Sequence, residues 1–211
     1  MNTLIAARIT LLSVVTLVLG LSPQAAADDW TGFRGTQGNP VSNSQLPLEW
    51  DVEKGNNIAW KADIPGRGVS GPIVVGNRLV VTASGGVNQQ RLYVLCFDVT
   101  SGKQLWRRDF WATGRTYSHP TSANAAPTPV SDGKLIFAFY SSNDLICLDL
   151  DGNLKWFRGL AHDYPKAGND VGMAASPVVA GNVVIVQIEN QGDSFACGVD
   201  KISGLEVWRK P

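Results

Sequence analysis

The sequence predicts an all-β fold built from a repeated unit of four short antiparallel strands. Tryptophans recur 46, 50 and 52 residues apart, at Trp60, Trp106, Trp156 and Trp208. An aspartate and a glycine precede each of the last three tryptophans in the same order. No stretch after residue 28 keeps a helical apolar period for three turns. Four-stranded sheets bury little alone and must stack, so we expect a β-propeller with roughly four to eight blades in the full ring.

The first 27 residues are expected to be a secretory signal peptide. They combine one basic residue, Arg8, with an apolar run over 9–21 and small residues up to Ala27, after which cleavage is expected. The apolar run is short for a membrane span, although an uncleaved N-terminal anchor is the alternative. Either way the remainder is exported, so we expect a periplasmic or secreted protein with no integral membrane span after signal cleavage.

The exported part divides into an N-terminal extension over 28–57 and a partial propeller over 58–211. Full copies of the repeat are expected at about 71–110, 126–160 and 175–211. The whole chain has 18 Lys and Arg against 18 Asp and Glu, so no strong field favours nucleic acid or an anionic membrane as the partner.

Each copy divides into four strands in the same way. The first strand follows a proline and ends at a two-residue turn, which is Gly76-Asn77, Asp132-Gly133 or Gly181-Asn182. Such pairs supply the left-handed backbone that tight hairpins need. The second strand is rich in β-branched and aromatic residues, the third ends in aspartate, and the fourth carries the tryptophan. A β-sandwich is the alternative, but it gives no reason for this order to recur three times.

The repeated aspartate, glycine and tryptophan are expected to be structural. The three sets are Asp98, Gly102 and Trp106; Asp149, Gly152 and Trp156; and Asp200, Gly204 and Trp208. The aspartate can accept backbone N–H bonds from the turn, and the glycine supplies its left-handed residue. The indole can lie between blades and bury about 150–250 Å², worth about a few kcal/mol. The alternative, a ligand-stacking platform, would not need one tryptophan per blade.

Three cysteines remain in the exported part, at nearly the same place in the three copies. Cys96 and Cys147 stand two residues before the repeated aspartate, and Cys197 stands three before it. Equivalent positions in neighbouring repeats need not reach disulfide distance, so we interpret them as small buried apolar residues. Metal binding is the alternative, but no Cys-x-x-Cys spacing supports it.

The repeat resembles that of a known family. Asp-x-x-x-Gly-x-x-x-Trp, at 98–106 and 200–208, looks like the tryptophan-docking repeat of pyrroloquinoline-quinone-type propellers, and 149–156 is a version one residue shorter. The resemblance covers about 58–211. The family includes quinone-dependent alcohol and sugar dehydrogenases, and also non-enzymatic scaffolds such as the propeller lipoprotein of outer-membrane barrel assembly. The resemblance therefore implies the fold more strongly than an activity.

A lone strand precedes the first full copy. Residues 57–65 look like an outer strand, but the last copy already has its own. Three blades and a spare strand make an open arc with exposed strand faces. We therefore expect an N-terminal fragment of a longer protein, in which further copies close the ring; assembly of two or more arcs is the alternative.

Two insertions interrupt the repeat and are the candidate binding loops. They span 111–127 and 161–176, and with the connection at 64–71 they lead into successive blades, so we expect all three on one face of the propeller. The candidate binding residues are Arg67, Arg115, Tyr117, His119, Asn124, His162, Asp163, Tyr164, Lys166, Asn169 and Asp170. There are two alternatives to a binding site. One is a metal site at His119 and His162, and the other is that these polar side chains only form hydrogen bonds within the loops.

The leading functional expectation is a non-catalytic, exported scaffold that recognises a protein or polymer through these loops. The chain has no Cys-Cys pair, no Cys-x-x-Cys-His and no Gly-x-Ser-x-Gly, so no catalytic residue and no cofactor is predicted. The alternative, implied by the resemblance, is a quinone-dependent oxidoreductase of alcohols or sugars. It would need pyrroloquinoline quinone, Ca²⁺ and a carboxylate base.

Overall fold

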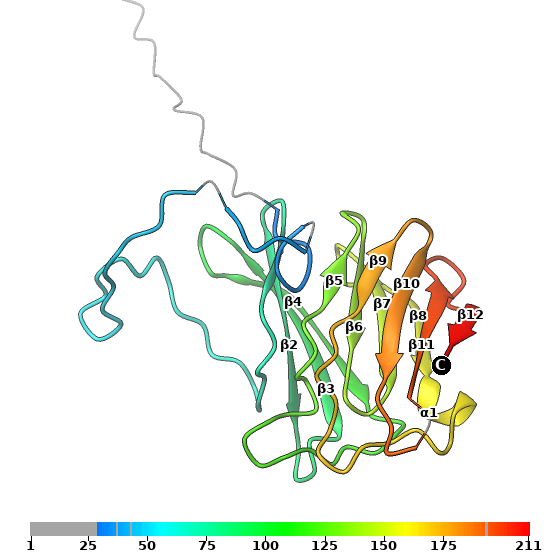
Figure 1. Ribbon diagram of the computed structural model, residues 1–211. Coiled ribbons are helices and arrows are strands. Elements are labelled where there is room, and N and C mark those ends of the chain that lie inside the picture. The colour runs from blue at the N-terminus through cyan, green and yellow to red at the C-terminus, as the bar shows by residue number, and fades with distance from the viewer. Residues whose placement is uncertain (1–28, 37, 43, 193) are drawn as a thin grey trace, which may run out of the picture.

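The computed structural model describes residues 29–36, 38–42, 44–192 and 194–211, and its strands form three four-stranded antiparallel sheets (Figure 1). The predicted signal peptide lies outside the described residues. The first blade contains β1 (Ile73–Val75), β2 (Arg78–Gly85), β3 (Arg91–Asp98) and β4 (Gln104–Trp111). The second contains β5 (Val130–Ser131), β6 (Leu135–Phe139), β7 (Asp144–Asp149) and β8 (Leu154–Gly159). The third contains β9 (Val178–Ala180), β10 (Val183–Ile188), β11 (Phe195–Asp200) and β12 (Glu206–Lys210).

Each sheet is a meander in which neighbouring strands in sequence are neighbours in space. The predicted all-β class and the four-stranded blades are confirmed. A single short helix, α1 (Leu160–Asp163), follows β8 among the described residues. None of the helices that the structure describes is long and apolar enough to cross a membrane.

The apolar core lies between the blades rather than within one sheet. Between the first two blades, Val94 and Ile146 belong to one buried cluster. Between the second and third, Phe137 and Val186 belong to another. The opposite face of the first blade is covered by Trp60 of the lone N-terminal segment. Each sheet therefore buries its apolar side chains by stacking against its neighbour.

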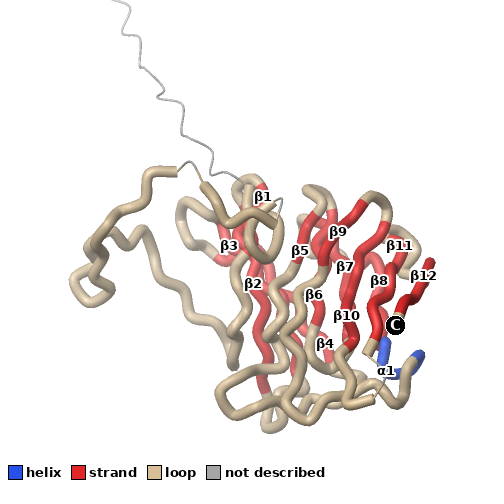
Figure 2. The backbone as a smooth tube through the Cα atoms, viewed as in Figure 1, coloured by secondary structure: helices blue, strands red, loops and turns tan. Residues whose placement is uncertain are grey.

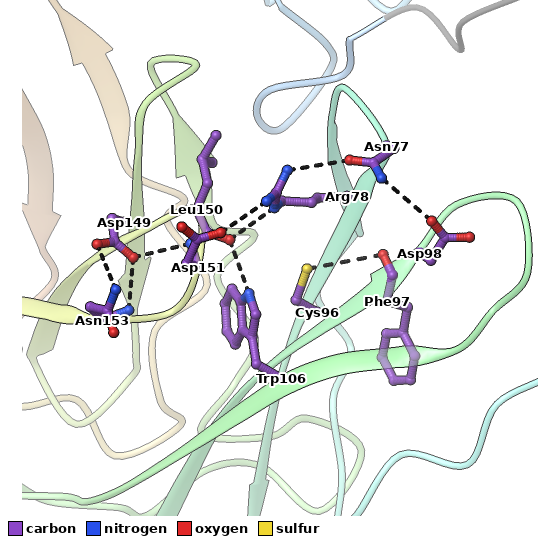
Figure 3. A network of polar contacts seen from close by, with 10 residues as sticks. All are labelled: Asn77, Arg78, Cys96, Phe97, Asp98, Trp106, Asp149, Leu150, Asp151 and Asn153. Atoms are coloured by element: carbon purple, nitrogen blue, oxygen red, sulfur yellow. Dashed lines mark hydrogen bonds and ion pairs between the residues drawn. The ribbon is translucent and has the colours of Figure 1, made fainter.

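The tryptophans join each segment to the following blade at the outer edge. Their indole Nε1–H groups donate to the carbonyl one residue after the repeated aspartate: Trp60 to Val99 at 2.7 Å, Trp106 to Leu150 at 3.0 Å, and Trp156 to Lys201 at 2.8 Å. The ring also lies against the turn glycine, where a Cβ would overlap it. Figure 3 shows the second of these contacts. The aspartate, glycine and tryptophan are thus parts of one joint between blades.

The repeated aspartates organise the turn that receives the indole. Asp98 accepts bonds from the backbone N–H and the hydroxyl of Ser101, at 2.8 and 2.7 Å, and these bonds lower its pKa. Burial alone would raise the pKa of Asp149, but bonds from Lys155 and Asn153 outweigh it and hold the pKa well below its usual value. The carboxylates therefore stay ionised and fix the loop that the neighbouring tryptophan covers.

A second joint links the blades at their inner edge. The N–H of Gly71 donates to the Thr128 hydroxyl at 2.9 Å, and the N–H of Thr128 donates to the Ser176 hydroxyl at 3.0 Å. Each of these residues directly precedes the proline that opens its blade. Neighbouring blades are therefore tied at both edges, with the apolar cluster between.

The strand register corrects the expectation that the three cysteines occupy nearly the same place. Cys96 and Cys147 stand opposite the tryptophans of their own blades, but Gly198 takes this position in the third blade. Cys197 therefore points to the other face of its sheet, because a shift of one residue reverses the side of a strand. All three thiols are free and buried, and burial raises their pKa to about 12, 12 and 11 in chain order.

Candidate functional site

Three connections leading into successive blades contact one another at one end of the strands. The Arg67 guanidinium donates to the Pro120 carbonyl at 2.6 Å, which joins 64–71 to 111–127. The His119 N–H donates to the Val171 carbonyl at 3.0 Å, which joins 111–127 to 161–176. Figure 2 shows these connections as loops at the lower end of the strands. We call the three segments the loop face.

The 111–127 loop is held near its end by a buried amide. Asn124 is completely buried; its Nδ2 donates to the Gln89 carbonyl at 3.2 Å, and its Oδ1 accepts from the Ser142 N–H at 2.8 Å. Gln89 has φ +55°, a left-handed conformation that is uncommon outside glycine, and its Nε2 reaches the Ser118 hydroxyl at 3.2 Å. Asn124 therefore positions the loop, and its side chain does not face solvent.

A buried carboxylate holds the start of the same loop. Asp144 is fully buried and accepts bonds from the backbone N–H of Thr113 at 3.1 Å, the Thr113 hydroxyl at 2.6 Å and the Ser142 hydroxyl at 2.6 Å. Burial raises the pKa of Asp144, although these bonds and the nearby His162 oppose the rise. The loop is thus fixed at two points before any partner binds.

The solvent side of the loop face carries a charged and aromatic cluster. Arg115 pairs with Asp170 at 2.6 Å and lies over the Tyr117 ring, 5.4 Å from its centroid. Gln191 donates to the other oxygen of Asp170 at 2.7 Å; this bond and the arginine lower the Asp170 pKa. Tyr117 remains 57% exposed, so it is available to a partner.

The two predicted histidines come from different loops. The His119 Nδ1 lies 2.8 Å from the Thr121 hydroxyl, within its own loop. His162 is exposed on α1. Among the described residues, no group of three or more His, Cys, Asp or Glu is placed to hold a metal ion.

The remaining predicted residues tie the 161–176 loop to the blades. Asp163 pairs with Arg158 of β8, and the Tyr164 hydroxyl donates to Glu206 of β12. Asn169 accepts a bond within its own loop. The loop therefore bridges the outer strands of the second and third blades.

A groove of about 1070 Å³ opens beside this loop, and the sequence did not predict it. Its lining includes Tyr164 and Lys166 of the loop, Phe195 of β11 and Arg209 of β12. The two aromatic rings meet edge to face with centroids 4.7 Å apart, and the Arg209 guanidinium lies over both, at 5.2 and 5.4 Å. In the sequence, this groove is signalled by Arg209, which directly follows Trp208 on a strand that was expected to be structural.

The repeat and the fold identify the family. The family model described as outer membrane protein assembly factor BamB matches residues 41–211. The chain belongs to this family. The resemblance inferred from the Asp-Gly-Trp repeat is thereby confirmed. A search of curated proteins finds no match to this chain.

Solved structures with propellers are similar in fold. A quinohemoprotein alcohol dehydrogenase from Comamonas testosteroni matches with a TM-score of 0.55 and 17% identity, over 88% of this chain and 27% of that one. A quinohemoprotein alcohol dehydrogenase from Pseudomonas putida HK5 matches with a TM-score of 0.52 and 17% identity, over 71% and 21%. BamB from Moraxella catarrhalis matches with a TM-score of 0.44 and 18% identity, over 69% and 36%. The chain spans about a fifth to just over a third of these structures, and such identities show the fold alone.

Proposed function

We propose that this chain is an exported, non-catalytic propeller module that binds a protein partner through the loop face. The observation that supports this most is the fixation of the 111–127 loop by two buried polar clusters, around Asn124 and Asp144. A loop fixed in advance loses little conformational entropy on binding, so its contacts contribute more fully to affinity. The family description, an assembly factor of the outer membrane, agrees with a protein partner and a periplasmic location.

The loop face offers the chemistry of a protein interface. Tyr117 is an exposed aromatic side chain stacked by Arg115, and tyrosine and arginine dominate interface energetics. Asp170 and Asp163 are each engaged by an arginine, so the carboxylates do not leave a strongly acidic surface. A mixed polar and aromatic patch of this kind suits a protein partner better than a polyanion.

Quinone chemistry would require a cofactor platform and metal ligands. Among the described residues no group of three or more His, Cys, Asp or Glu is placed to hold a metal ion, and the two carboxylates of the loop face, Asp163 and Asp170, are paired with arginines. These residues do not fit such a group, so we derive no step through a quinone or a metal.

Site-specific photocrosslinking in the exporting cell tests the proposal. A photoreactive residue at Tyr117 should crosslink one protein partner, whereas the same residue at Thr100, on a turn at the opposite end of the strands, should not. Arg115→Ala should reduce the Tyr117 crosslink. Equal crosslinking at both positions contradicts the proposal, as does robust dye reduction on alcohols or sugars after addition of pyrroloquinoline quinone and Ca²⁺.

A further inference from the structure

The N-terminal segment 29–36 lies across the inner strands of the first two blades. Trp30 forms two backbone hydrogen bonds of 2.9 Å with Val74 of β1, one in each direction. The carboxylate of Asp29 accepts the Gly76 N–H at 2.7 Å, directly after the end of the same strand. Figure 1 shows the segment in blue at the upper ends of the blades, opposite the connections that form the loop face. The segment thus adds a short antiparallel strand to the edge of β1.

The same segment also contacts the second blade. The carbonyl of Thr31 accepts the N–H of Ser131 at 2.8 Å. A Cβ on Gly32 would lie 3.1 Å from a methyl carbon of Val130, so the backbone of the segment packs closely on this residue. Val130 and Ser131 are the whole of β5, the shortest strand among the described residues, and so short a strand forms few ladder bonds of its own. We call residues 29–36 the latch.

β5 is the direct continuation of the 111–127 loop. Thr128, the first residue after the loop, is bonded to the inner segments of both neighbouring blades. Asn124, near the end of the loop, donates its backbone N–H to the Gln89 side chain at 2.9 Å. The contact at Ser131, the joint at Thr128 and the anchor at Asn124 therefore follow one another along a short stretch of chain. Because these contacts lie in series, the position of β5 sets where the loop ends.

The latch joins parts of the chain that are far apart in sequence. Trp30 precedes Val74 by 44 residues, and Thr31 precedes Ser131 by 100. Contacts between such distant segments form late in folding, because closing a long loop first costs conformational entropy. None of the latch residues belongs to the buried apolar clusters that the described part of the chain forms. The latch can therefore open while the blades stay folded.

We propose that the latch regulates the loop face from the opposite end of the blades. With the latch closed, β5 and the end of the 111–127 loop are held in the partner-binding arrangement; with the latch open, the anchor at Asn124 loosens and affinity for the protein partner falls. The inference rests on the proposed function, because the loop face is where the partner binds. It deepens that function by making partner binding conditional on the first two blades being folded and joined.

Hydrogen exchange in the full chain tests whether the latch acts as one unit. The N–H groups of Val74, Gly76 and Ser131 donate to the latch, so they should exchange together through one opening that leaves the blade core protected. Gly32→Val places a larger side chain against Val130 and should speed exchange of all three amides by about tenfold or more. Independent exchange of the three amides overturns the proposal.

The coupling to the loop face has its own readout. In Gly32→Val the backbone N–H of Asn124 should lose protection together with that of Ser131. Phe33→Ala is the matched control: this side chain is 62% exposed in the same segment, so neither amide should change. Asp29→Ala removes one acceptor of the latch and is the milder variant if Gly32→Val does not fold; it should change the same two amides in the same direction.

Photocrosslinking at Tyr117 connects the latch to the partner. Gly32→Val should lower the crosslink by about threefold or more, because apparent affinity falls with the fraction of chains whose binding site is competent. Faster exchange at Ser131 with unchanged exchange at Asn124 and an unchanged crosslink overturns the proposal. If Asn124 follows Ser131 while Tyr117 crosslinks no protein even in the parent chain, the coupling stands and the proposed function is wrong.

Discussion

The two junctions between blades have the same three kinds of contact, but they differ in additional polar contacts. Each has an inner N–H to hydroxyl bond, a buried apolar cluster and an outer indole to carbonyl bond. The first junction adds Arg78, which bonds the Leu150 carbonyl and pairs with Asp151, with side chains 29% and 75% exposed. The second adds an ion pair between Lys201 and Asp132, whose side chains are only 16% and 15% exposed. The repeat therefore specifies that blades stack, and the residues outside it distinguish one junction from the other.

Removing the shared indole should have the largest effect at both junctions. Trp106→Ala and Trp156→Ala should each lower the free energy of unfolding by about 3 kcal/mol, because packing and a hydrogen bond are lost together. Urea unfolding followed by circular dichroism measures this. Trp50→Ala is the control: Trp50 is 66% exposed, so its removal should cost about 1 kcal/mol or less. Equal losses of stability in all three variants would contradict the role of Trp106 and Trp156 in joining the blades.

The ion pairs should contribute differently to the stability of the two junctions. Asp132→Ala leaves Lys201 largely buried without its partner and should cost about 2 kcal/mol, whereas Asp151→Ala removes an exposed partner of Arg78 and should cost about 0–1 kcal/mol. The same denaturant titration compares the two, and raised salt should reduce only the smaller effect appreciably. An equal cost for both would show that burial does not distinguish the junctions.

The inner hydroxyls should contribute alike. Thr128→Val removes the acceptor of the Gly71 N–H, and Ser176→Ala removes the acceptor of the Thr128 N–H, so each should cost about 1 kcal/mol. Hydrogen exchange at the two donor amides is the direct readout, and each amide should lose protection only in its own variant. Loss of protection at both amides in either variant would indicate general unfolding instead.

Acid should affect the second junction through Asp132. Burial alone would raise the pKa of Asp132, but Lys201 and two backbone N–H groups outweigh it and lower the pKa. A lowered pKa in the folded state gives stability that is present above the ordinary value of 3.8 and is lost as pH falls through the folded value. Asp132→Asn should therefore flatten the fall of stability below about pH 4 by a few tenths of a kcal/mol. An unchanged acid profile would contradict the assigned pairing.

The sequence predicted the blades well because their signals are local. The turn after Asp98 and the indole of Trp106 belong to one short repeat that can be compared with its copies. The register of Cys197 was harder, since one extra residue before Asp200 reverses the strand face. The burial of Asn124 depends on Gln89, 35 residues away, and a single sequence gives no sign of that contact.

The sequence predicted which segments form the candidate site, but not what each residue does there. The three loops were chosen as breaks in the repeat, and the structure places them in contact. The groove was not foreseen, because Tyr164 belongs to the connection after the second blade and Arg209 to β12 of the third, and the two meet only in the folded chain.

The exchange of the indole N–H protons tests most directly whether a tryptophan joins each blade to the next. In ¹⁵N-labelled protein, the Nε1–H groups of Trp60, Trp106 and Trp156 should exchange slowly with solvent, because each donates to a carbonyl of the following turn. Trp50 is 66% exposed, and its Nε1–H has no acceptor among the described residues, so it should exchange fast. Exchange at the same rate for all four would contradict the stacking of the blades through their indoles.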